Sequence, residues 1–272
     1  MSDTDGDGAS LEQLARGALD GDRGAVEQLV RALQGDVYGL ALRMLWQRES
    51  AEDAAQEILI RVVTRLSQFD FRSRLRTWVF RVATNYLLDV KKSPTERFEL
   101  SFERFAEDLA DGLSSDGPAD GERSVLTEEV KIGCTLGMLQ CLDRPHRAAY
   151  ILGAILELPS PEAALALDIE PAAFRKRLER ARTRVESFAG RHCGLVVPEA
   201  ACQCNRRVPA ALALGRVRPT ELQFAGAGCS FDEARDEVRV LDGARRVMEL
   251  HRRSRPRSSD VDFARRLISV LT

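Results

Sequence analysis

The sequence predicts an all-α protein with two helical domains and a mostly helical C-terminal extension. Apolar residues recur at steps of three and four through most of the chain, whereas alternating β-branched runs and hairpin dipeptides are scarce. A proline followed by a glycine- and serine-rich stretch separates the helical segments. The 272 residues, 44% of them hydrophobic, are enough for two or three domains with cores and exclude a wholly disordered chain.

The first helical group occupies residues 10–93, after an acidic, glycine-rich tail at residues 1–9 that we expect to be disordered. Apolar periodicity predicts four helices, at 11–19, 24–45, 51–69 and 75–90. The last two each have one apolar stripe and a charged opposite face. We expect these four helices to pack as one bundle.

Charge is strongly patterned, although the whole chain has 40 basic and 42 acidic residues and a net charge of −2. Residues 60–92 hold eight basic and two acidic side chains, and residues 171–186 hold six and two. Residues 94–129 hold three basic and eleven acidic ones, which suggests an acidic flexible linker. Two basic segments around an acidic one are typical of a nucleic-acid-binding protein with two contact modules. Solvated helix faces would explain one basic run more easily than two.

The second domain, residues 130–190, ends in a helix-turn-helix pattern. Ser160 and Pro161 suit a helix start, residues 168–170 form a turn, and a longer basic helix begins at Pro171. A short helix, a tight turn and a long basic helix are the arrangement that places the second helix in the major groove of DNA. The alternative is an ordinary helix pair with a basic solvent face.

Several segments resemble the extracytoplasmic-function sigma factors of bacterial RNA polymerase. Residues 51–57 and 66–70 resemble the region 2 helix that binds polymerase, and residues 72–85 resemble the promoter-melting segment. Residues 165–169 and 174–182 resemble the helix-turn-helix of region 4. The resemblance spans residues 10–190, about two thirds of the chain, and both motifs occur in the family's order across an acidic linker.

The resemblance implies a non-catalytic initiation subunit that binds core RNA polymerase and directs recognition and melting of promoter DNA. An anti-sigma protein would be a further partner. The implied polymerase contacts are Asp53, Gln56 and Glu57. The implied contacts to the −10 element are Phe71, Arg72, Ser73, Arg74, Arg76, Trp78, Arg81 and Asn85. The implied contacts to the −35 element are Ala172, Arg175, Lys176, Arg177 and Arg180.

Two features of these segments qualify the implied DNA contacts. Phe71 is the favoured base-stacking residue, because Trp78 lies on the apolar stripe and is expected to be buried. Asp168 stands where the family's turn usually has glycine, but Asp tolerates a left-handed backbone. Glu170 and Ala173 replace the usual hydroxyl residues, so a helix cap and a phosphate contact are lost, which weakens expected −35 binding but not the fold.

The C-terminal extension, residues 191–272, begins with a cluster of cysteines and has helical patterns at 208–214, 232–251 and 262–271. Three interpretations remain open for the cluster: a zinc site, a thiol redox switch, and simply buried cysteines. The candidate zinc ligands are His192, Cys193, Cys202 and Cys204, with Cys229 as an alternative fourth ligand. Initiation itself requires no cofactor. We expect the extension to pack on region 2 or region 4 and to regulate promoter access.

The basic residues Arg206 and Arg207 follow the pair Cys202 and Cys204, and we expect them to lower the pKa of these thiols. Cys134 and Cys141, in a helical region, are expected to be core residues. Six cysteines in a chain of this kind do not predict a disulfide framework.

Two other function classes compete with the sigma factor interpretation. A free-standing helix-turn-helix regulator would leave the face of Asp53, Gln56 and Glu57 without a role. A thiol oxidoreductase would use Cys202 and Cys204, but the sequence has neither a CxxC pair nor a phosphate-binding glycine loop. No stretch approaches the roughly 18 consecutive apolar residues of a membrane helix. The acidic N-terminus is unlike a secretory signal, so we expect a cytoplasmic protein.

Overall fold

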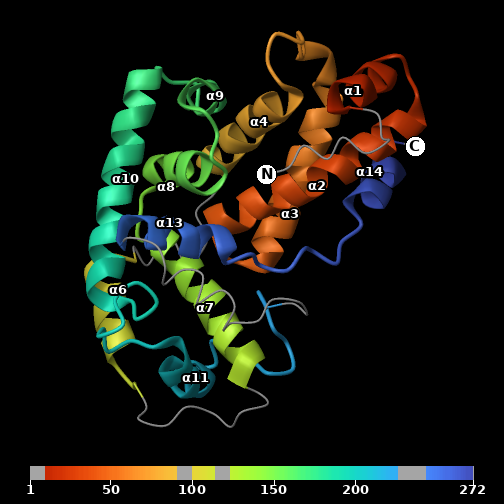
Figure 1. The fold of residues 1–272 in the computed structure, drawn as a ribbon. Helices are drawn as coiled ribbons and strands as arrows, with labels where there is room; N and C mark the ends of the chain where they lie inside the picture. Colours follow the sequence, from red (N-terminus) through yellow and green to blue (C-terminus); the bar gives the residue numbers. More distant parts are fainter. Residues whose placement is uncertain (1–9, 91–99, 114–122, 226–242, 272) are drawn as a thin grey trace.

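The computed structural model describes residues 10–90, 100–113, 123–225 and 243–271, and throughout these ranges the chain is helical or irregular (Figure 1). The only β geometry in the described ranges is an isolated backbone bridge between Cys193 and Cys202. The all-α prediction is confirmed. The predicted disordered tail, residues 1–9, lies outside the described residues.

The N-terminal group packs as the sequence predicts, with helix α2 at its centre. Ser10 caps the first helix and forms a capping box with Gln13, and Asp22 accepts hydrogen bonds from the first turn of the second helix. The predicted helix over 51–69 begins earlier and ends in a short 3₁₀ turn. The elements are α1 (Leu11–Leu19), α2 (Arg23–Leu45), α3 (Arg48–Thr64), η1 (Leu66–Gln68) and α4 (Leu75–Asp89).

The buried face of helix α4 is shifted from its apolar stripe, because Trp78 and Tyr86 of the stripe are only half-buried. Thr77, Phe80 and Thr84 are all buried, in addition to stripe residues such as Val79. The reason is tertiary, because α4 packs against the rest of its bundle and also against helix α9 (Ser160–Ala166) of the second group. Its N-terminus is capped from another helix, since the Leu75 amide donates to the Glu12 carboxylate at 3.0 Å.

The structure differs from the expected flexible linker over residues 94–129. Helix α6 (Phe102–Ala110) forms within it, capped by Ser101, and α7 (Arg123–Gln140) begins before its end. Phe105 of α6 is buried and stacks on Phe188 with ring centroids 5.4 Å apart. An amphipathic helix of this kind is stabilised by the packing of its apolar face, although the segment as a whole has an acidic composition typical of a linker.

The second group contains the helix-turn-helix. Its elements are α7, α8 (Arg144–Tyr150), the π-helical turn η2 (Ile151–Ile155), α9 and α10 (Pro171–His192). Helix α9 begins at Ser160 with Pro159 in the N-cap position, one residue earlier than the helix start that Ser160 and Pro161 predict. Gly153 is required in η2, because a Cβ there would lie 2.7 Å from the Leu178 side chain and 2.9 Å from that of Phe174.

The C-terminal extension packs on both groups. Its described helices are α11 (Cys204–Ala213), α13 (Gly243–Arg253) and α14 (Phe263–Leu271), and part of the helix predicted over 232–251 lies outside the described residues. Figure 1 shows α13 beside α10 and α14 beside α2, and residues of α13 contact α10 just as residues of α14 contact α2. The Glu129 carboxylate of α7 accepts the backbone amides of Gln223, Phe224 and Ala225 at 2.6–2.9 Å. One buried apolar cluster runs through all three parts.

Candidate nucleic-acid interface

The helix-turn-helix has the geometry that its sequence predicts. Asp168 adopts a left-handed backbone with φ of 53° in the turn between α9 and α10. Glu170 precedes α10 and makes no side-chain cap, as its replacement of a hydroxyl residue predicts. The side of α10 away from the core is basic and open to solvent. Ala172, Arg175, Lys176 and Arg180 are exposed there, and Arg177 is half-buried.

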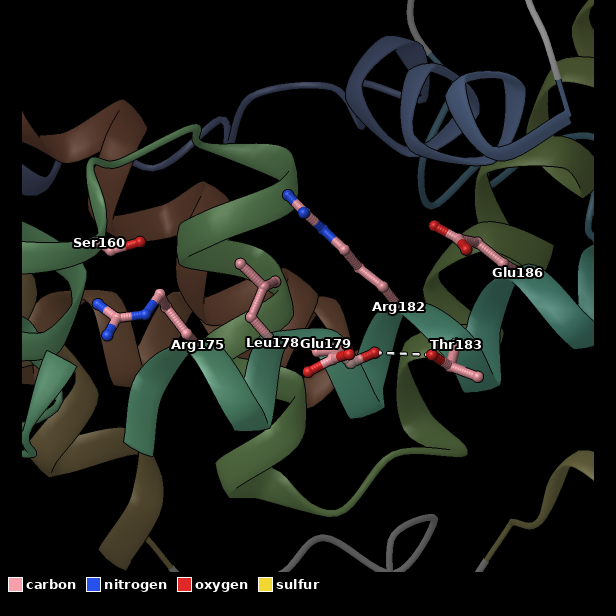
Figure 2. A pocket seen from close by; sticks show the side chains of 7 residues that line it. All are labelled: Ser160, Arg175, Leu178, Glu179, Arg182, Thr183 and Glu186. Atoms are coloured by element: carbon pink, nitrogen blue, oxygen red, sulfur yellow. Dashed lines mark hydrogen bonds between the residues drawn. The ribbon is translucent and has the colours of Figure 1, made fainter. Parts of the chain in front are cut away.

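A shallow pocket of about 470 Å³ lies along one flank of α10 (Figure 2). The Thr183 hydroxyl in its wall donates to the Glu179 carbonyl at 3.0 Å. Two arginines and two glutamates line the pocket together, so it has no net preference for an anion such as phosphate. The lining residues are Ser160, Arg175, Leu178, Glu179, Arg182, Thr183 and Glu186.

The loop before α4 carries an aromatic cluster. Phe71 has a left-handed backbone with φ of 58°, and its ring centroid lies 4.6 Å from that of Phe69. Trp78 is half-buried, 5.7 Å from Phe69, rather than fully inside the core. The Arg16 guanidinium of α1 lies 4.1 Å from the Phe71 ring centroid. Sequence reasoning missed Arg16, since nothing in its local pattern links it to a loop about 55 residues away.

The polar residues predicted for the −10 element fall into paired and open positions. The Arg76 guanidinium pairs with Asp36 at 2.9 Å, and burial raises the pKa of Asp36. Arg81 pairs with Asp168 of the helix-turn-helix at 2.8 Å. Arg72 pairs with Asp70 at 3.5 Å and is exposed, Arg74 and Asn85 are also exposed, and Ser73 is half-buried. The loop and α4 therefore present basic residues next to the aromatic cluster.

Helix α4 and helix α9 meet through hydrogen bonds that the sequence did not predict. The Thr77 hydroxyl donates to the Glu162 carboxylate at 2.9 Å. The buried Thr84 hydroxyl lies 2.6 Å from the Ala166 carbonyl, to which it donates. The structure thus places the predicted −10 residues directly beside the helix-turn-helix.

The predicted polymerase-binding residues share one side of α3. Asp53 is exposed, and Gln56 and Glu57 are half-buried. Glu57 pairs with Arg61 at 2.7 Å, and the Arg61 guanidinium lies 4.6 Å from the Tyr86 ring centroid. The Gln56 side-chain oxygen accepts a hydrogen bond from Arg266 of α14 at 3.3 Å.

The predicted zinc ligands are not assembled into a site in the described part of the chain. Residues 10–90, 100–113, 123–225 and 243–271 contain no group of three or more His, Cys, Asp or Glu side chains placed to hold a metal ion. The His192 ring packs 5.0 Å from the Phe188 ring, and Cys229 lies outside the described residues. Every cysteine in the described ranges is free.

The pKa values of the Cys202 and Cys204 thiols are raised, whereas the nearby Arg206 and Arg207 were expected to lower them. Burial raises the pKa of Cys202 to about 11 and raises the pKa of Cys204 well above its usual value. The neighbouring thiols raise both values further, and the basic side chains offset only part of the effect. The expected activation of this pair is therefore wrong. Cys141 is buried as expected, and Cys134 is partly exposed.

Comparison with known families gives one domain match. The family model described as sigma-70 region 2 matches residues 29–95, which contain α3, α4 and the aromatic loop. Among solved structures, CnrH in complex with the cytosolic domain of CnrY is similar with a TM-score of 0.44 and 23% identity, covering 65% of this chain and 95% of that one.

Curated relatives extend the similarity beyond that domain. RNA polymerase sigma factor NccH of Alcaligenes xylosoxydans xylosoxydans is 31% identical over 178 residues, covering 65% of this chain and 93% of NccH. ECF RNA polymerase sigma factor SigW of Bacillus subtilis (strain 168) is 28% identical over 174 residues, covering 60% of this chain and 87% of SigW. Among the described helices, none is long and apolar enough to cross a membrane.

Proposed function

The chain belongs to the extracytoplasmic-function family of RNA polymerase sigma factors, and we propose that each of its three predicted contact surfaces binds a different partner during initiation. The α3 face with Asp53, Gln56 and Glu57 binds core polymerase. The aromatic loop and α4 bind and open the −10 element, and the basic face of α10 binds the −35 element. The observation that carries the proposal is the sigma-70 region 2 match over the helices that hold the first two surfaces.

The chemistry of the aromatic loop suits an unpaired base. Phe71 is half-buried beneath the Arg16 guanidinium, and an unpaired base that displaces Arg16 would stack on its ring, a contact that contributes about 1–3 kcal/mol per base. Arg72 and Arg74 are exposed beside it and attract the phosphates of a single strand. The exposed Arg175, Lys176 and Arg180 suit the phosphates and guanine edges of a duplex major groove.

We propose the following domain organisation for this function. Residues 10–93 act as region 2, residues 94–129 connect the domains, residues 130–190 act as region 4, and residues 191–272 form a regulatory extension. The chain is a non-catalytic subunit in this proposal, since polymerisation chemistry belongs to the core enzyme. It acts in the cytoplasm, and an anti-sigma protein is a further partner.

Promoter-dependent transcription by core polymerase tests the proposal. The template is first selected from genomic DNA by binding to the reconstituted holoenzyme. We expect the full chain to yield specific transcripts, and a variant with Asp53→Lys and Glu57→Lys to lose both transcripts and polymerase binding. The matched control, Glu107→Lys with Glu199→Lys, changes two exposed acids away from α3 and should behave as wild type.

The alternative, a free-standing helix-turn-helix regulator, predicts a different outcome. The full chain would then bind duplex DNA with the affinity set by α10 but would neither associate with core polymerase nor support transcription. Such a result would contradict the proposed role of the α3 face.

Zinc at the cysteine cluster remains a separate proposal, on Cys193, Cys202 and Cys204 with His192 or Cys229 as fourth ligand. Zinc would bind thiolates and hold the start of the extension to the end of α10. Elemental analysis of the purified chain and of a Cys202→Ser, Cys204→Ser variant tests it. Zinc in the wild type that is lost in the variant supports the site, and wild-type protein without zinc contradicts it.

A further inference from the structure

The end of the chain lies across helices α2 and α3. Phe263, Ala264 and Leu267 of α14 are at most 2% exposed, and the Phe263 ring centroid lies 6.4 Å from that of Tyr38 in α2. The opposite side of α14 is open, with Arg265 and Arg266 exposed. This segment, residues 257–271, is therefore seated on the N-terminal bundle by a short apolar stripe.

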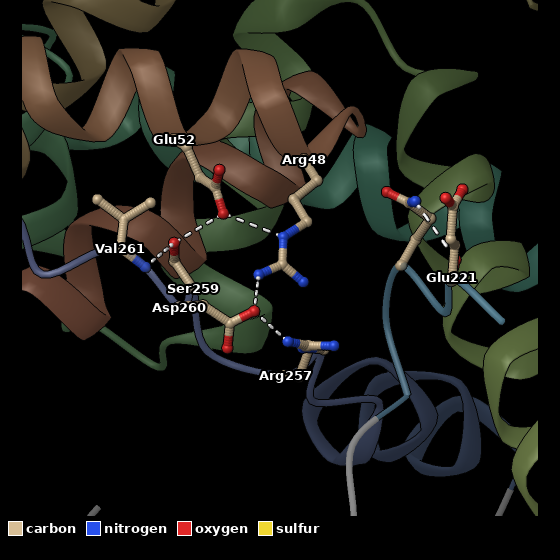
Figure 3. Close-up of polar contacts among 8 residues, drawn as sticks. Arg48, Glu52, Glu221, Arg257, Ser259, Asp260 and Val261 are labelled. Atoms are coloured by element: carbon tan, nitrogen blue, oxygen red, sulfur yellow. Dashed lines mark hydrogen bonds and ion pairs between the residues drawn. The ribbon is translucent and has the colours of Figure 1, made fainter.

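Polar contacts fix the segment along one edge of α3 (Figure 3). Asp260 accepts from Arg48 at 2.9 Å and also pairs with Arg257. The Ser259 hydroxyl donates to the Glu52 carboxylate at 2.7 Å, and that same oxygen accepts from Arg48 at 3.0 Å. Charges on the segment are thus matched to charges on α3.

Two further polar contacts join the segment to α2 and to a later turn of α3. Asp262 pairs with Arg31 of α2 at 3.4 Å and caps α14 by accepting the Arg265 amide at 3.0 Å. Arg266 donates to Gln56 at 3.3 Å. Gln56 lies one helical turn beyond Glu52 and next to Asp53 and Glu57, so the segment reaches the proposed polymerase-binding face.

We propose that residues 257–271 are a built-in competitor for the polymerase-binding face of α3, and that core polymerase binds only when this segment has moved away. The inference rests on the proposed function of Asp53, Gln56 and Glu57. A protein partner that buries Gln56 must displace the Arg266 side chain that contacts it. The segment therefore lowers the apparent affinity for polymerase by the fraction of chains in which the face is free.

The contacts are weak enough for such a switch. Arg31 and Asp262 are 47% and 44% exposed, and Asp260 is 74% exposed, so these ion pairs are screened by solvent. The apolar contact consists of one face of a nine-residue helix. A large polymerase interface can displace an element held in this way, whereas the buried core beneath α2 and α3 stays intact.

The affinity of the full chain for core polymerase tests the inference. In the Asp260→Arg, Asp262→Arg variant, new arginines face Arg48, Arg257 and Arg31, and the cap of α14 is lost. We expect the Kd for polymerase to fall about three- to tenfold. The control is Glu107→Arg with Glu199→Arg, which makes the same change of net charge at exposed acids remote from α3.

Hydrogen exchange on the wild-type chain provides a second measurement that needs no substitution. Backbone amides in residues 263–271 should exchange faster when polymerase is added, because α14 is displaced. Equal Kd values for variant and control, together with unchanged exchange, would overturn the inference alone. If Asp53→Lys with Glu57→Lys binds polymerase as tightly as wild type, the proposed polymerase face is wrong and the inference falls with it.

Discussion

At the scale of single residues, buried arginines connect the two helical groups. Arg147 of α8 is 3% exposed, and its guanidinium donates to four backbone carbonyls. These carbonyls belong to the end of α2, the end of α7 and the turn that follows, namely Met44, Leu139, Gln140 and Leu142. A buried charge is tolerated only when its donors are used in this way.

Replacing Arg147 should therefore destabilise the whole chain. Arg147→Met keeps the apolar stem but leaves the carbonyls without donors, and we expect the free energy of unfolding to fall by about 3 kcal/mol. Urea unfolding followed by circular dichroism measures the change. Arg180→Met, at an exposed position of α10, serves as the control and should stay within about 0.5 kcal/mol of wild type. A loss below 1 kcal/mol for Arg147→Met would contradict a structural role.

His251 is a buried histidine held neutral. It is 2% exposed, its Nε2 has no hydrogen-bond partner among the described residues, and its ring lies edge-on to Tyr150 with centroids 5.4 Å apart. Burial, and secondly the charge of Arg43, lowers the pKa of His251 from 6.5 to about 3. Between pH 6.5 and about pH 3, His251 is therefore protonated in the unfolded chain but neutral in the folded chain.

Stability should fall as pH drops through this window. The contribution of His251 is fully present above pH 6.5 and decreases toward pH 3, by about 2 kcal/mol at pH 5. His251→Phe removes the titrating group, so its free energy of unfolding should change less between pH 7.5 and pH 5. Urea unfolding at both pH values compares the two proteins, and an equal pH dependence would show that His251 is not buried neutral.

At the scale of elements, α10 combines two faces with different tasks. Phe174, Leu178 and Val185 are buried in the core, while Arg175 and Lys176 point to solvent from the same turns. The helix is thus fixed in place by its apolar stripe, and its basic side remains open for phosphates.

Removing basic residues from α10 should change the salt dependence of duplex binding. We expect Arg175→Ala with Lys176→Ala to weaken binding at low salt and to reduce the slope of log K against log salt by about 2. Fluorescence anisotropy with a labelled duplex over a salt series measures the slope. Arg191→Ala, exposed at the other end of α10, is the control. An unchanged slope in the double variant would place the duplex elsewhere.

At the scale of the whole molecule, the proposed −10 surface on α4 lies against helix α9 of the helix-turn-helix. Arg81 pairs with Asp168, but the two side chains are 41% and 67% exposed, so the pair contributes at most about 1 kcal/mol. Thr77 also gives its hydrogen bond to Glu162 of α9. DNA that binds α4 must compete with these acidic side chains of the helix-turn-helix.

Neutralising the two acids should open α4 to single-stranded DNA. Asp168→Asn keeps a residue that accepts the left-handed backbone, and Glu162→Gln keeps the size of the side chain. We expect the double variant to bind a single-stranded oligonucleotide about two- to fivefold more tightly than a Glu107→Gln, Glu199→Gln control with the same net charge. Equal affinities in anisotropy titrations would show that α9 does not shield α4.

Local signals in the sequence predicted much of this arrangement. The helices of the N-terminal group and the left-handed turn at Asp168 follow from periodicity and from the backbone preference of Asp. Helix α6 was missed because its acids hid an amphipathic stripe whose partner, Phe188, lies about 83 residues away. The thiol pKa values were predicted in the wrong direction, since neighbouring charge can be read from sequence but burial cannot.

The sequence by itself determined that the fold is all-α, where most of the helices lie, which helix faces are basic, and that the chain resembles sigma factors, because these depend on residues close together in the chain. Only the tertiary structure decided that Thr84 serves a contact between α4 and α9, and that Arg266 contacts Gln56. Such contacts join positions about 82 and 210 residues apart, and their energy comes from burial and geometry that no local pattern encodes.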